Sequence, residues 1–161
     1  SGPVASTPYS TWASTAGLTV GVNDGKGQDP DNDGRPNILE FALNGNPLSG
    51  TADGKVRARA ETVGGDSVFT ITLPVRTGAT FTGATAKSAT LDGVTYRIEG
   101  SDANLTDWDI VVTEVSPATT TNPVMPTLDS GWTYRTFRSP GAINADPQDF
   151  LRVKATEVIV P

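Results

Sequence analysis

From residue 55 onward, the chain alternates apolar and polar residues with a period of two, most clearly in 69–75 and 94–99. Because successive residues of a strand point to opposite faces, this pattern predicts strands with one buried and one exposed face. The apolar positions that we expect to point inward are Phe69, Ile71, Leu73, Val94, Tyr96 and Ile98.

Turn-forming residues separate these runs, and Asp92-Gly93 is a hairpin signal between two short ones. About six or seven strands with turn signals between them predict a mostly β fold, an antiparallel β-sandwich. The segments 79–89 and 116–129 are rich in Thr, Ala and Pro, and we expect surface connections there with little core-forming content. The segments that continue the alternation are 109–115, 132–138 and 150–159.

The first fifty residues carry two short helical signals on either side of a Gly-, Asn- and Asp-rich loop. Thr7 is a suitable N-terminal cap for the first helix, and Gly17 suits its C-terminal turn. The second helix is expected over 36–45, with its apolar residues on one face. We therefore predict a helical segment, 1–50, packed on a β-sandwich, 51–161.

The loop before the second helix contains a complete calcium-binding pattern. The twelve residues from Asp29 to Glu40 match D-x-D/N-x-D/N-G-x5-E. Calcium takes six to eight oxygen ligands, and a tight loop brings carboxylates at alternate positions to one point, with Gly34 allowing the sharp reversal. The alternative is a solvated acidic turn that holds no ion, but such a turn meets every fixed position only rarely by chance. The predicted ligands of the Ca²⁺ cofactor are Asp29, Asp31, Asp33, the Arg35 carbonyl, Asn37 acting through water, and Glu40.

This loop differs from an EF-hand in two ways. The residues Gly25 to Gln28 cannot end an entering helix, so only the exiting helix is expected. Pro36 lacks the backbone N–H that normally pairs with a sister loop. The sequence therefore predicts a solitary, structural calcium site, similar to the loops of thrombospondin type 3 repeats and dockerins.

The composition removes most catalytic chemistry. The chain has no His and no Cys, so the commonest general base and thiol nucleophiles are missing. The remaining catalytic alternatives are Ser–Lys chemistry, Tyr-based chemistry and carboxylate pairs, such as Glu99 with Asp102 or Asp107 with Asp109. Acidic turns produce such pairs routinely, and we expect no enzyme. The net charge of −6, with no basic run, argues against a nucleic acid or an anionic membrane as partner.

Three aromatic residues are candidates for carbohydrate binding, because sugar rings stack on flat aromatic faces. Trp132 and Tyr134 are two residues apart and predicted on one strand face, which makes this pair the first choice of platform. Trp108 follows a turn and is the second choice. Each of these rings can instead belong to the core, and Trp12 is expected to serve packing only. The negative chain favours a neutral polysaccharide, and a connector domain without a glycan ligand is the alternative.

The order of these motifs resembles a family of domains. Trp12 and Gly17-Leu18 precede the acidic stretch Asp29–Pro47, and strand motifs follow it. The whole resembles the C-terminal domains of large secreted proteins from Verrucomicrobia and Planctomycetes, many of them polysaccharide-degrading. The resemblance implies a secreted, extracellular accessory module attached to a catalytic domain of the same parent chain. We expect the chain to be a monomer. The strand motifs that carry it are Tyr96–Ser101, Leu105–Trp108 and Phe150–Lys154.

Overall fold

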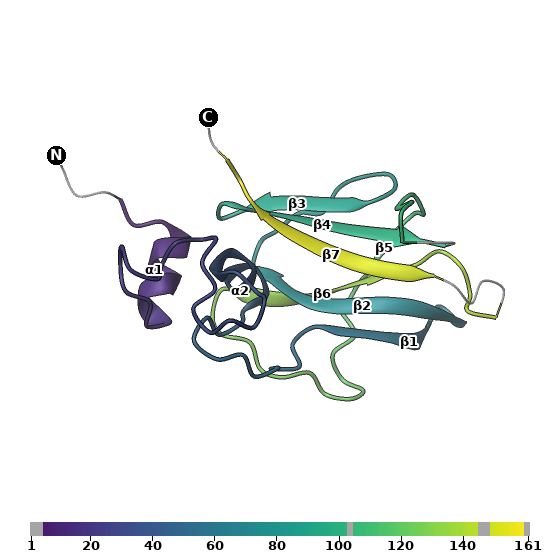
Figure 1. The fold of residues 1–161 in the computed structure, drawn as a ribbon. Coiled ribbons are helices and arrows are strands. Elements are labelled where there is room, and N and C mark those ends of the chain that lie inside the picture. Colours follow the sequence, from purple (N-terminus) through teal and green to yellow (C-terminus); the bar gives the residue numbers. More distant parts are fainter. Residues whose placement is uncertain (1–4, 103–104, 145–148, 160–161) are drawn as a thin grey trace.

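The computed structural model describes residues 5–102, 105–144 and 149–159. Its main feature is a pair of antiparallel sheets, with strand orders β1-β2-β6-β5 and β3-β4-β7 (Figure 1). The mostly β fold with antiparallel pairing, predicted from the period-two pattern, is therefore confirmed. The strands are β1 (Arg57–Val63), β2 (Asp66–Arg76), β3 (Lys87–Leu91), β4 (Val94–Ser101), β5 (Thr113–Val115), β6 (Trp132–Arg138) and β7 (Phe150–Glu157).

The hairpin predicted at Asp92-Gly93 joins β3 to β4. Asp92 has φ 54° and Gly93 has φ 80°, so both central residues are in the left-handed region. Positive φ at both positions is what a tight two-residue hairpin needs to match the twist of its strands.

Two helices lie at one end of the sheets, and α2 is the nearer to the strands (Figure 1). Helix α1 (Pro8–Thr15) begins at the predicted cap, where the backbone N–H of Ser10 donates to Thr7 Oγ1 at 3.1 Å. Helix α2 (Asn37–Leu43) is shorter than predicted, because Pro36 is its extended N-cap and Asn44 ends it at φ 56°. In the described chain no helix precedes the acidic loop directly, as expected from its glycines.

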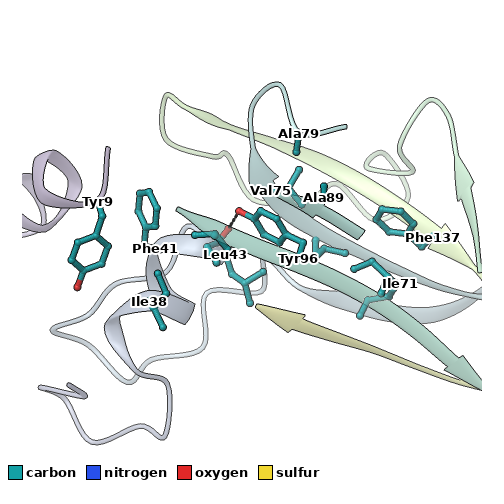
Figure 2. Close-up of a cluster of buried hydrophobic side chains, with 14 of the residues drawn as sticks. Tyr9, Ile38, Phe41, Leu43, Ile71, Val75, Ala79, Ala89, Tyr96 and Phe137 are labelled. Atoms are coloured by element: carbon teal, nitrogen blue, oxygen red, sulfur yellow. Dashed lines mark hydrogen bonds between the residues drawn. The ribbon is translucent and has the colours of Figure 1, made fainter. Parts of the chain in front are cut away.

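The core lies between the two sheets and continues onto α2, which contacts β2, β4 and β7. The hydroxyl of Tyr96 on β4 donates to Ala42 O in α2 at 2.8 Å (Figure 2). The same hydroxyl accepts from Arg76 N at 3.0 Å. This buried phenol therefore ties the helical segment to both sheets. The predicted inward residues that are buried in this core are Ile71, Leu73, Val94, Tyr96 and Ile98.

The outer face of β2 is also buried, which period-two alternation did not predict. The 116–129 connection runs beside this face and is held by side chains of β1. Arg57 donates to Pro123 O at 2.6 Å and to Thr119 O at 2.9 Å. The Thr119 hydroxyl in turn donates to Glu61 Oε1 at 2.7 Å. The threonines of this face, Thr70 and Thr72, are therefore buried beneath this connection.

Two expectations about the core are wrong. Phe69 is only half-buried and lies outside the central cluster, whereas its neighbour Val68 is fully buried. The 79–89 segment contributes buried Ala79 and Ala89, and Phe81 packs against Phe137 with ring centroids 4.8 Å apart. The short alanine side chains let this connection approach the sheets closely. The Thr- and Ala-rich segment therefore contributes to the core, although its composition predicted little core-forming content.

In the part of the chain that the structure describes, neither helix combines the length and the apolar character needed to cross a membrane.

Candidate functional site

The acidic loop is folded so that three carboxylates converge. One oxygen each of Asp29, Asp31 and Asp33 lies within 4.8 Å of the others. Backbone N–H groups hold them there: Gly34 N donates to Asp29 Oδ2 at 2.9 Å, and Arg35 N donates to Asp33 Oδ1 at 2.8 Å. Gly34 has φ 90°, a conformation that side chains disfavour, which explains the glycine at the reversal.

The donor set of this cluster fits a hard cation. Asp31 Oδ2 is buried without a hydrogen-bond partner in the described residues. A buried carboxylate oxygen without a donor is costly, and a cation would satisfy it. Three carboxylates grouped on a tight loop are oxygen ligands of the kind that calcium takes.

Glu40 lies one turn into α2 and is 2% exposed. Burial raises its pKa to about 7; repulsion from Asp33 and Asp31 adds to this effect, whereas Arg35 opposes it. A Cβ added at Gly45 would overlap the Glu40 carboxylate, so this carboxylate occupies a space that only glycine leaves open. The role of Glu40 as a ligand of an ion in the loop remains a prediction.

Arg35 is the cation that the structure brings to this site. Its Nη1 lies 3.5 Å from Glu40 Oε1, and its Nε lies 3.8 Å from Asp33 Oδ2. The guanidinium therefore links the acidic cluster to Glu40, which is not itself grouped with the three aspartates. Four carboxylates against one guanidinium leave a local negative charge for a divalent cation to balance.

Asn37, which was predicted as a water-mediated ligand, has a structural role in the loop. Its Nδ2 donates to Asn23 O at 2.8 Å and to Gly25 O at 2.9 Å, which anchors the loop before the acidic stretch. Its Oδ1 is buried without a hydrogen-bond partner among the described residues. The water-mediated ligand role of Asn37 remains a prediction.

Trp132 and Tyr134 on β6 are held by different segments. Trp132 is half-buried, its Nε1 donates to Phe41 O at 2.9 Å, and the Arg76 guanidinium lies 4.3 Å from its ring centroid. The Tyr134 hydroxyl donates to Pro126 O at 2.7 Å. Both rings of the predicted pair are therefore held by other segments of the chain. Trp132 bonds to α2, and Tyr134 bonds to the 116–129 connection.

Trp108 is half-buried and covered on one face. The Arg152 guanidinium lies 3.6 Å from the centroid of its ring, and Trp108 Nε1 donates to Leu105 O at 3.0 Å. A ring stacked against a guanidinium has lost one of its two faces for a sugar.

Glu99, a member of one suggested carboxylate pair, is surrounded by cations. Burial alone would raise its pKa, but hydrogen bonds from Arg97, Arg152 and Lys154 outweigh burial and lower the pKa to about 2. The Nε atoms of Arg97 and Arg152 lie 2.5 and 2.7 Å from its oxygens. A carboxylate held ionised in this way is poorly suited to act as a general acid.

A groove between α1 and the start of β6 was missed by sequence reasoning. Its volume is about 610 Å³, and its wall includes Trp12 and Trp132 together with Arg76 and Asp129. These residues are far apart in the chain, so no local pattern groups them. Two of them carried a signal: Trp132 was predicted to form a platform with Tyr134, and Trp12 was expected only to pack.

Comparison of the chain with protein-family models, with curated proteins and with solved structures found no match.

Proposed function

We propose that this chain is a non-catalytic accessory module of a secreted, multidomain protein, stabilised by one calcium ion and binding a neutral polysaccharide. The observation that carries the proposal is the convergence of Asp29, Asp31 and Asp33 within 4.8 Å, in a loop that leads into buried Glu40. An ion held there would join the loop to α2. Because α2 packs on both sheets, the ion would act on the stability of the whole fold.

The non-catalytic part of the proposal is supported by the residue types that the chain lacks and by the surroundings of the suggested carboxylates. The chain has no His or Cys, and Glu99 is engaged by three cations. Asp102, Asp107 and Asp109, the other suggested carboxylates, are exposed and not enclosed in a buried site.

Calcium titration by isothermal calorimetry tests the first part of the proposal. Wild-type chain should bind one ion, Asp31→Ala should lose most of the affinity, and Asp109→Ala should bind as the wild type does. Asp109 is a matched control because it is an exposed aspartate outside the loop. Equal binding by all three proteins, or by none, would refute the calcium site.

A connector domain without a glycan ligand is the second candidate. The guanidinium groups over Trp132 and Trp108 favour it, because each occupies an aromatic face that a sugar would need. A carbohydrate microarray probed with the calcium-loaded chain separates the two candidates. Signals on neutral glycans support the polysaccharide proposal, and a blank array supports the connector.

A further inference from the structure

The groove between α1 and β6 does not stand alone. A second groove of about 460 Å³ shares three lining residues with it: Trp12, Thr15 and Asp129. Because they share these residues, the two grooves adjoin, with Trp12 common to both. Each volume is within the range of about 300–1,000 Å³ that is typical of small-molecule sites. Two adjoining hollows suit an extended ligand with repeating units better than one compact molecule.

The lining chemistry favours a ligand that is polar but uncharged. Arg76 and Asp129 bring one positive and one negative charge to the first groove. Lys55 adds a positive charge to the second groove, and its Nζ lies 3.6 Å from Asp53 Oδ2. Arg76 Nε is engaged by Asp92 at 2.8 Å, and its two Nη atoms donate no hydrogen bond within the described residues. Exposed Thr11 adds a hydroxyl group that can donate and accept, and the Thr15 hydroxyl, which donates to Thr11 O at 2.9 Å, can accept. These donors and acceptors match sugar hydroxyls.

Trp12 is the ring best placed for stacking. It is half-buried, and its ring contacts are tilted ones with Tyr9 and Phe41, at centroid distances of 5.5 and 5.4 Å. No cation lies over it among the described residues, in contrast to Trp132 and Trp108. Its indole therefore has open surface in both grooves.

The wall opposite α1 is rigidly supported by α2. Phe41 is fully buried, packs edge-to-face on Trp132 at 6.0 Å, and accepts the hydrogen bond from its indole. Asn44, which ends α2, exchanges two hydrogen bonds with Asp129, of 2.8 and 3.0 Å. The residues that would meet a ligand are thus fixed before it arrives, which lowers the entropic cost of binding.

We propose that these two adjoining grooves bind a segment of neutral polysaccharide, with one sugar stacked on Trp12 and its hydroxyls bonded by Arg76, Asp129 and the threonines of α1. This inference rests on the proposed function and locates its ligand away from Trp108 and Tyr134. Polyanions are disfavoured by the net charge of −6, and polycations are disfavoured by Arg76 and Lys55 in the lining.

The test is retention on insoluble glucan, xylan and mannan, with polygalacturonate as the charged control, using the full calcium-loaded chain. Thr15→Arg would fill the shared part of the grooves from an exposed helix position, and Ser14→Arg adds the same charge at the neighbouring exposed position outside them. We expect Thr15→Arg and Trp12→Ala to weaken binding at least tenfold, and Ser14→Arg and Trp108→Ala to change it less than twofold.

The outcomes separate this inference from the proposed function. Wild-type binding that survives Thr15→Arg and is lost in Trp108→Ala would overturn the groove site and leave the polysaccharide proposal standing. Retention of the wild type on none of the polymers would overturn both. If Trp12→Ala proves unstable, Thr15→Arg alone tests the groove site. Thr15 is exposed, so this variant should fold, and its melting curve can be compared with that of Ser14→Arg.

Discussion

Glu40 and Glu99 are both buried glutamates, exposed by 2% and 5%, but their surroundings are opposite. Glu99 lies on β4 with three cations of its own sheet around it, and its pKa falls to about 2. Glu40 lies on α2 beside an acidic loop with one guanidinium near it, and its pKa rises to about 7. A buried carboxylate needs a compensating charge. The sheet supplies that charge from its own residues, whereas the helical end has a surplus of acid that an external cation would balance.

The largest expected effect is that of calcium on the helical end. A calcium concentration a hundredfold above the dissociation constant should stabilise the wild type by about 2.7 kcal/mol. The increment should vanish in Asp31→Ala and persist in Glu99→Gln, because Glu99 is already balanced by protein cations. Thermal melting with calcium or with a chelator measures it. If chelation leaves the wild-type melting temperature unchanged, no calcium ion compensates the acidic charge around Glu40.

The next effect tests the space around Glu40. Gly45→Ala should destabilise the chain by about 1–3 kcal/mol, because the new methyl group overlaps the Glu40 carboxylate. It should also weaken calcium binding. Gly27→Ala is the matched control, since a Cβ there meets nothing within 4 Å. Denaturant unfolding of both variants should separate them, and equal stabilities would show that Glu40 has room to move.

Low pH should remove the stabilisation that ionised Glu99 contributes to the fold. Its folded-state pKa of about 2 lies below an unfolded value of about 4.3, so its stabilisation is present above that unfolded value and is lost as the pH falls toward 2. Glu99→Gln should cost about 1–2 kcal/mol at neutral pH and flatten the loss of stability below about pH 4.3. Glu114→Gln, which removes a more exposed partner of Arg135, is the control. A wild-type acid slope in Glu99→Gln would contradict the depressed pKa.

The smallest effect should have opposite signs in two conditions. Arg35→Gln removes the guanidinium near Asp33 and Glu40, and should destabilise the calcium-free chain by about 0.5 kcal/mol because the pair is partly exposed. The same change should tighten calcium binding about two- to fivefold, since Arg35 competes with the ion for the same charges. Lys87→Gln on β3 controls for the change in net charge. An Arg35 variant that binds calcium more weakly would indicate that the guanidinium supports the site.

Features that depend on consecutive residues are predicted well from the sequence, whereas contacts between distant residues are not. Thr7, Gly34 and Asp92-Gly93 were interpreted correctly, because capping, a reversed turn and a tight hairpin depend on a few consecutive residues. The convergence of Asp29, Asp31 and Asp33 also follows from local spacing. Their use by an ion remains a prediction.

Burial and neighbours were decided by the tertiary structure. Nothing near Glu99 in the sequence shows that Arg152 and Lys154 lie beside it, since they come from β7, which pairs with β4 only in the folded sheet. The alternation in β2 correctly identified its inner face, but the 116–129 connection decided that its outer face is buried as well. The groove at Trp12 arises where α1, β2, β6 and the residues before β6 meet, at positions more than a hundred residues apart in the chain. Local pattern determines the conformation of each segment, whereas long-range packing determines which side chains share a site, because it depends on the whole chain at once.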